Sequence, residues 1–267
     1  MSQTTPATTP RPSRAQAWLL AARPATLPAA VGPVLVGLSV AISLGTFELP
    51  PAVACLAVAL LLQVASNVGN DLSDFRSGVD TEARLGPPRA AALGLLSERE
   101  MLAGLGLIVG LAGLVGLYLV WLGGPVILVL GVAAVISAFA YSGGPWPYGY
   151  HGLGEVFVFV FFGLVAVAGT TYLQTLTWEP LAFAAAIAVG SFITAILVVN
   201  NLRDIDTDRA AGKRTLAVML GERGAVAEYD LLLGVAYALP VALVIAGDAS
   251  FAVLLPLASL PLALAIY

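Results

Sequence analysis

Long apolar runs separated by short polar segments make up most of this chain from residue 18 onward. About 20 consecutive apolar residues span the hydrocarbon core of a bilayer as a helix. Because backbone polar groups in lipid must be hydrogen-bonded internally, the runs are predicted to be helices rather than strands. Eight runs have spanning length: 18–44, 51–70, 101–121, 124–142, 153–174, 180–200, 225–247 and 249–267. The pattern predicts an all-α fold, a polytopic transmembrane helical bundle.

The third apolar run carries a series of glycines. Small residues let membrane helices approach one another closely. The glycines are Gly104, Gly106, Gly110, Gly113 and Gly116. We interpret this series as a helix-packing surface rather than a functional feature.

Nearly all basic residues lie in three of the polar segments. Of the twelve Lys and Arg residues, Arg23 lies near the start of the first run, and the other eleven lie before that run, between the second and third, or between the sixth and seventh. With eight spans these segments share one side of the membrane, and the positive-inside rule makes that side cytoplasmic. The other side carries only acids: Glu48, Glu179 and Asp248. We expect a multi-pass protein of a prokaryotic plasma membrane, with its N-terminus and basic loops in the cytoplasm.

Composition supports the membrane interpretation. A chain of 267 residues would suit one or two soluble domains, but 59% of the residues are hydrophobic and the mean hydropathy is +0.94. The single cysteine, Cys55, lies in an apolar run and indicates no redox compartment. Residues 1–17 are rich in Thr, Pro and Ser and are predicted to be a disordered cytosolic tail. Residues 18–267 are predicted to form a single transmembrane domain.

Two polar segments that end apolar runs share one layout. If the segment that begins at Asn200 is helical, Asn200, Asp204 and Asp208 are spaced i, i+4, i+8 and lie on one face. Asn67 and Asp71 repeat the four-residue spacing at the end of the second run. Carboxylates at a bilayer edge are costly unless they have a function, and such oxygens suit a hard cation such as Mg²⁺. We expect the two segments to converge at the inner face.

Basic residues accompany both acidic segments. Arg84 and Arg89 follow the first, and Lys213 and Arg214 follow the second. Carboxylates that bind Mg²⁺ beside Arg and Lys form the arrangement that a diphosphate needs, and the apolar bundle could hold a lipid tail. The sequence contains no Walker loop or dinucleotide fingerprint, so neither a nucleotide nor a nucleic-acid partner is expected. The predicted ligand is a polyprenyl diphosphate.

These residues carry a resemblance to a known family. The paired Asn/Asp segments resemble those of the UbiA superfamily of intramembrane prenyltransferases. Further segments resemble its 1,4-dihydroxy-2-naphthoate polyprenyltransferase branch: residues 23–28 (RPATLP), 78–89 with their LGPPR, 148–157 (YGYHGLGEVF) and 200–220. The superfamily has nine helices and eight runs are visible here, so we expect that the ninth helix is missing or that the chain is truncated. The resemblance implies an enzyme that transfers a polyprenyl group to 1,4-dihydroxy-2-naphthoate, releases CO₂ and diphosphate, and gives demethylmenaquinol in menaquinone biosynthesis.

The resemblance also implies a site. Its magnesium ligands and catalytic acids would be Asp71, Asp74, Asp204 and Asp208, with Asn67 as a further ligand and Asn70, Asp80 and Asn200 as weaker candidates. Its diphosphate-binding cations would be Arg84, Arg89, Lys213 and Arg214. Arg23 is expected to bind the acceptor's carboxylate or the diphosphate, or to be a positive-inside anchor. Tyr141 is expected to stabilise a carbocation with its ring or to be an interface tyrosine. Glu155 is either an active-site acid or a first-turn acid favoured by the helix dipole.

Two alternatives remain open. A related prenyltransferase could use another acceptor, such as 4-hydroxybenzoate, a chlorophyllide or haem. A cation-coupled transporter would instead place its acids near the middle of the membrane on broken helices, whereas here they lie at helix ends.

Overall fold

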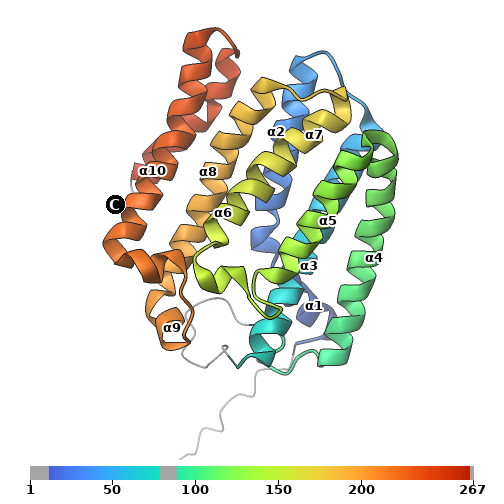
Figure 1. Ribbon diagram of the computed structural model, residues 1–267, viewed down its shortest axis with the longest axis vertical. Coiled ribbons are helices and arrows are strands. Elements are labelled where there is room, and N and C mark those ends of the chain that lie inside the picture. The colour runs from blue at the N-terminus through green and yellow to red at the C-terminus, as the bar shows by residue number, and fades with distance from the viewer. Residues whose placement is uncertain (1–11, 79–88, 265–267) are drawn as a thin grey trace, which may run out of the picture.

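The computed structural model describes residues 12–78 and 89–264, and every regular element in these residues is a helix (Figure 1). The elements are α1 (Arg14–Ala22), η1 (Pro24–Thr26), α2 (Pro28–Ser43), α3 (Leu49–Arg76), α4 (Glu98–Gly123), α5 (Pro125–Ala140), η2 (Tyr148–His151), α6 (Gly154–Val158), η3 (Phe159–Val165), α7 (Ala166–Thr175), α8 (Pro180–Arg203), α9 (Ile205–Ala210), α10 (Leu216–Ala246), η4 (Phe251–Ser259) and α11 (Leu260–Leu264). The predicted all-α fold class is confirmed.

Each of the eight predicted runs is largely helical, but not all of these helices are long. Among the described residues, five helices are long and apolar enough to cross a membrane, or six if α1–η1 and α2, bent by 49°, form one span. The run 124–142 gives only the 16 residues of α5, or about 24 Å at 1.5 Å per residue. The run 249–267 folds in part as the 3₁₀ element η4. The helix count therefore roughly matches the eight predicted runs, and the shorter helices differ in length because apolar length alone does not register where a helix stops.

The first helix begins earlier along the chain than predicted. Ser13 caps α1 by accepting a hydrogen bond from the Gln16 backbone N–H, and the Gln16 side chain bonds back to Ser13. This reciprocal capping box stabilises a helix start. Residues 14–17 are therefore helical, whereas residues 1–11 lie outside the described part of the chain.

Close helix crossings occur at glycines outside the predicted series. A Cβ atom built on Gly163 would lie 2.7 Å from Gly190 Cα, so η3 and α8 touch through their backbones. In the predicted series, Gly104 lies against Trp18, but a Cβ on Gly106, Gly110, Gly113 or Gly116 would meet no atom within 4 Å. The interpretation of the whole series as a packing surface was wrong, because sequence spacing does not reveal which helix face has a neighbour.

The polar ends of several helices gather at one end of the bundle. The C-terminal end of α3, drawn in cyan, and α9, drawn in orange, both lie at the bottom of Figure 1. At this end Arg14 pairs with Glu100 of α4, and Arg76 pairs with Glu98. The two acidic segments therefore lie on the same side, as the sequence predicts.

Candidate active site

A cavity of about 1210 Å³ lies inside the bundle. Its apolar wall includes Val34 of α2, Leu119 of α4 and Phe161 of η3. Its polar wall is made by residues from both acidic segments and the loops beside them: Asn67, Asn70, Asp74, Arg89, Tyr150, Asn200, Asn201, Asp204, Asp208 and Lys213. The cavity therefore joins a charged end to an apolar interior, as an amphiphilic ligand requires.

The first acidic segment belongs to the last turns of α3. Asn67 is 5% exposed, and its Nδ2 donates to Ala22 O and to Thr26 Oγ1, both at 2.9 Å. Asn70 Oδ1 accepts from Ser142 Oγ at 2.7 Å. These contacts attach α3 to the turn after α1 and to the loop after α5, and they fix the orientation of the amides.

Asp71 is the most deeply buried acid of this segment. It is 1% exposed and is not among the described residues that line the cavity. Its Oδ2 accepts from the backbone N–H of Ala90 at 3.1 Å, and its Oδ1 has no hydrogen-bond partner among the described residues. Because Ala90 follows Arg89, Asp71 fixes the backbone that carries this arginine.

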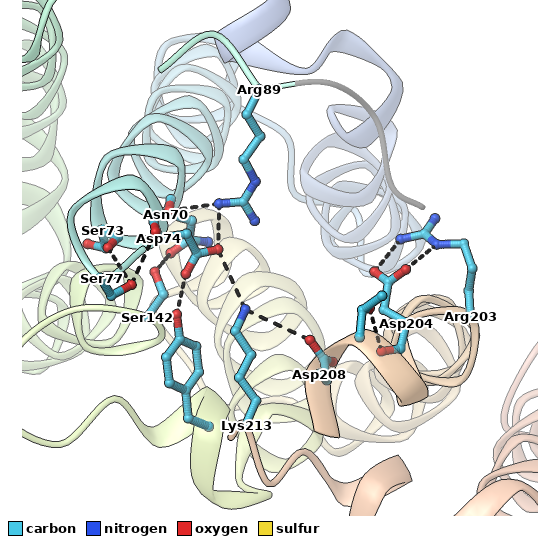
Figure 2. A network of polar contacts seen from close by, with 12 residues as sticks. Asn70, Ser73, Asp74, Ser77, Arg89, Ser142, Arg203, Asp204, Asp208 and Lys213 are labelled. Carbon is cyan, nitrogen blue, oxygen red and sulfur yellow. Dashed lines mark hydrogen bonds and ion pairs between the residues drawn. The ribbon is translucent and has the colours of Figure 1, made fainter. Parts of the chain in front are cut away.

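Asp74 is the centre of the polar network (Figure 2). Its Oδ2 pairs with Arg89 and lies 3.7 Å from Lys213 Nζ, while its Oδ1 accepts a hydrogen bond from the hydroxyl of Tyr150. The side chains of Asp74 and Arg89 are only 4% and 6% exposed. A buried carboxylate is tolerated when it is paired and hydrogen-bonded in this way.

The second acidic segment lies where α8 ends and α9 begins. Asp204, with φ −95° and ψ 9°, departs from helical geometry. The backbone N–H groups on either side of this break still donate to the carbonyl oxygen four residues earlier: Asp204 N to Asn200 O at 3.1 Å and Asp208 N to Asp204 O at 2.8 Å. The four-residue hydrogen-bond spacing is thus kept across the break. Asp204 forms a two-point contact with the adjacent Arg203, at 2.8 and 2.7 Å. All three predicted oxygen ligands of this segment line the cavity.

Lys213 connects the two segments. Its Nζ lies 3.7 Å from Asp74 Oδ2 and 3.9 Å from Asp208 Oδ1 (Figure 2). A single ammonium group therefore contacts a carboxylate from α3 and another from α9. The expected convergence of the two segments is confirmed for Asp74 and Asp208.

Tyr150 is a site residue to which sequence reasoning assigned no role. Besides its bond to Asp74, its ring lies 4.6 Å from Lys213 Nζ, and its backbone O accepts from the backbone N of Arg214 at 2.9 Å. Burial, together with the neighbouring Asp74 carboxylate, raises the pKa of Tyr150, so the hydroxyl stays protonated and donates. The only signal in the sequence was the Tyr-Gly-Tyr segment, which marked a family branch without indicating a contact.

The other predicted residues are placed as follows. Arg23 and Tyr141 line the cavity, whereas the side chain of Arg214 is not among its lining residues. Arg23 adopts a left-handed conformation, φ 50° and ψ 69°, which ends α1 and turns the chain into η1. Such strain in a residue other than glycine is concentrated at functional sites. Asp80 and Arg84 lie outside the described residues.

The described acids and amides of the cavity wall could supply only part of the coordination of a metal ion. Among the described residues, no group of three or more His, Cys, Asp or Glu side chains is gathered to hold an ion. Mg²⁺ is usually held by one or two carboxylates together with substrate phosphates and water. Asp74, Asp208 and the amide oxygens on the same wall fit such partial coordination.

A multi-helix membrane bundle with paired acids and cations at one end of an apolar cavity defines the class: a membrane protein whose cavity suits an amphiphilic anion. The particular family follows from comparison with known proteins. The model of the UbiA prenyltransferase family matches residues 30–267, and the chain belongs to this family.

Named relatives are similar over most of the chain. It is 42% identical to a 1,4-dihydroxy-2-naphthoate octaprenyltransferase of Mycobacterium tuberculosis over 229 residues, which cover 86% of this chain and 78% of the relative. It is 42% identical to the Escherichia coli protein of the same name, covering 83% and 74%. A solved structure of a UbiA homolog from Archaeoglobus fulgidus bound to GPP and Mg²⁺ superposes with a TM-score of 0.65 at 17% identity, covering 90% of this chain and 81% of that one. The last comparison supports the fold.

Proposed function

We propose that this prenyltransferase transfers a polyprenyl group from polyprenyl diphosphate to 1,4-dihydroxy-2-naphthoate. CO₂ and diphosphate would be released, and demethylmenaquinol would form in menaquinone biosynthesis. The observation that carries the proposal is Lys213, which lies between Asp74 and Asp208 at the charged end of an apolar cavity. The names of the bacterial relatives at 40–42% identity favour this acceptor over 4-hydroxybenzoate, a chlorophyllide or haem.

Magnesium is the proposed cofactor. Asp71, Asp74, Asp204 and Asp208 would hold it, with Asn67 and with Asn70 and Asn200 as weaker ligands. Of these residues, all but Asp71 line the cavity, and the buried Oδ1 of Asp71 has no hydrogen-bond partner among the described residues. Bound Mg²⁺ would stabilise the charge that develops on the departing diphosphate. The homolog from Archaeoglobus fulgidus was solved bound to GPP and Mg²⁺, which agrees with this proposal.

The chain's own residues bind and orient the two substrates. Arg89 and Lys213, which pair with Asp74 here, are the described cations best placed to contact the diphosphate. The allylic C–O bond breaks and diphosphate leaves with the electron pair, while the apolar wall excludes water that would capture the cation. The ring carbon that carries the carboxyl group forms the new C–C bond, and CO₂ is lost from it. Arg23 is proposed to bind the acceptor's carboxylate, and Tyr141 presents its ring to the cation.

The charged end of the cavity is proposed to face the cytoplasm. Arg14, Arg76, Arg89 and Arg209 belong to the polar segments at this end, and the positive-inside rule assigns such residues to the cytoplasmic side. Polyprenyl diphosphate would place its head at this end and its tail in the bilayer.

The test is an assay in membranes that contain the expressed protein. They are supplied with a polyprenyl diphosphate and, in parallel, with 1,4-dihydroxy-2-naphthoate or 4-hydroxybenzoate, with Mg²⁺ or with EDTA. We expect prenylated naphthoate product and equimolar CO₂ only with Mg²⁺. If product forms with 4-hydroxybenzoate and not with the naphthoate, the acceptor is reassigned. Full activity in EDTA would overturn the metal proposal.

A further inference from the structure

Glu155 is a buried acid that the mechanism above does not use. It lies in the first turn of α6, is 4% exposed, and is not among the described residues that line the cavity. Its Oε1 accepts a hydrogen bond of 2.7 Å from Nδ2 of Asn201 on α8. Buried carboxyl groups inside membrane helices are costly, so such a group points to a function.

Asn201 connects this acid to the cavity. It is 8% exposed and belongs to the cavity wall. Its Nδ2 is engaged by Glu155, and its Oδ1 has no hydrogen-bond partner among the described residues. A carboxamide has one donating and one accepting end. The end that Asn201 offers to a ligand is therefore the accepting oxygen.

The cavity wall next to the Glu155–Asn201 pair is aromatic. Gly154, next to Glu155, packs on the ring of Tyr141: a Cβ at Gly154 would lie 3.4 Å from Tyr141 Cε2. Tyr141 meets Tyr148 edge to face with 5.5 Å between centroids, and Tyr148 stacks on Phe157 at 4.0 Å. All three rings line the cavity. Aromatic faces favour a flat aromatic ligand, and a hydrogen-bond acceptor beside them favours a ligand that carries a hydroxyl group.

We infer that Glu155 is a positioning residue that holds Asn201 so that its Oδ1 accepts a hydrogen bond from a ring hydroxyl of the aromatic acceptor. The inference rests on the proposed function, since it assigns a subsite to the second substrate. It places the aromatic ring against the wall that Tyr141, Tyr148 and Phe157 form in the same cavity.

The competing explanation is that Glu155 only stabilises the start of α6, where the helix dipole favours an acid. The two explanations differ in what a glutamine would do. Glu155→Gln keeps an oxygen that can accept from Asn201 but removes the charge that the dipole favours. Glu155→Leu removes both.

The experiment measures KM for each substrate, kcat and the thermal midpoint in detergent for the wild type and for Glu155→Gln, Glu155→Leu, Asn201→Leu and the double leucine variant. We expect both leucine variants to raise KM for the aromatic acceptor about fivefold to tenfold, as for the loss of one hydrogen bond. KM for the prenyl diphosphate and the Mg²⁺ activation curve should not change. The double variant should match the single ones, and Glu155→Gln should stay within about twofold of the wild type.

A substrate analogue makes the test independent of how well the Glu155 variants fold. Methylation of the ring hydroxyl that donates to Asn201 Oδ1 should raise the KM of the wild type for the aromatic acceptor. For that methyl ether, Asn201→Leu should raise the KM no further. The inference is overturned if Asn201→Leu raises the KM for each mono-methyl ether as much as it raises the KM for the parent acceptor. It is also overturned if the variants change the Mg²⁺ curve or the diphosphate KM instead. Turnover of the naphthoate by the wild type tests the proposed function separately. If the wild type uses another hydroxylated aromatic acceptor, the comparison of that acceptor with its methyl ethers tests the inference in the same way.

Discussion

The two acidic segments have the same sequence layout but lie in different environments. On α3 the carboxylates are enclosed: Asp74 is 4% exposed in its side chain and has three partners from other parts of the chain. At the α8–α9 junction, Asp204 is 18% exposed and pairs with its own neighbour, Arg203, which is 39% exposed. The first segment is preorganised by the fold, whereas the second is held mainly by contacts within its own segment.

The difference follows from where each helix ends. Asp71 and Asp74 lie inside the continuous helix α3, between α1 and the residues around Ala90. Asp204 lies at the break after α8, and the short helix α9 has no buried residue. We therefore expect changes in the first segment to affect both stability and activity, and changes in the second to affect activity alone.

The largest expected effect is the loss of the Asp74 charge. Asp74→Asn should lower kcat about 10²- to 10³-fold, since it removes the group on which both segments converge and a preorganised electrostatic contact of this kind contributes that much. Steady-state turnover in membranes measures the change. Asp206→Asn is the matched control: Asp206 lies in the second segment, but its side chain is 89% exposed and pairs only with Arg209 among the described residues. Equal losses in both variants would contradict the site.

Stability separates the two segments most directly. Asp71→Ala leaves the buried Ala90 N–H without its acceptor and removes a buried charge near arginines, so it should lower the free energy of unfolding by about 1–3 kcal/mol. Asp204→Ala should change the free energy of unfolding by less than about 1 kcal/mol, because it removes a partly exposed ion pair. Thermal unfolding in detergent compares them. A larger loss for Asp204→Ala would reverse the assignment of roles.

Lys213 tests whether the two segments act on one anion. Lys213→Gln should raise KM for the prenyl diphosphate about tenfold, because an ammonium group that contacts both segments is lost. Lys213→Arg keeps the charge and should recover part of the affinity. KM for the aromatic acceptor serves as the internal control. An unchanged diphosphate KM in Lys213→Gln would show that the anion binds elsewhere.

Sequence reasoning located charged residues of the cavity wall but not the contacts that orient them. Asp71 and Asp204 could be predicted because they repeat one spacing from an asparagine, and Asp74 and Asp208 because acids are scarce in an apolar chain and these two follow one turn later. The bonds of Tyr150 to Asp74 and of Glu155 to Asn201 join residues 76 and 46 positions apart. Such pairs leave no periodic signal, since they depend on how the loop after α5 folds back over the bundle. For the same reason the glycines of α4 could not be assigned to a crossing before the neighbouring helix was known.

The smallest expected effect tests one such contact. Tyr150→Phe removes the hydroxyl that donates to Asp74 but keeps the ring beside Lys213. A hydrogen bond to a charged group contributes about 1.5–3 kcal/mol, but Arg89 and Lys213 still neutralise Asp74, so the loss of kcat should be at the lower end, about tenfold. Tyr237→Phe is the control, since it removes a hydroxyl that bonds to Ser259, far along the chain from both acidic segments. If Tyr150→Phe is as active as Tyr237→Phe, Asp74 is oriented by its cations alone, and the first segment depends less on the loop that covers it than the structure indicates.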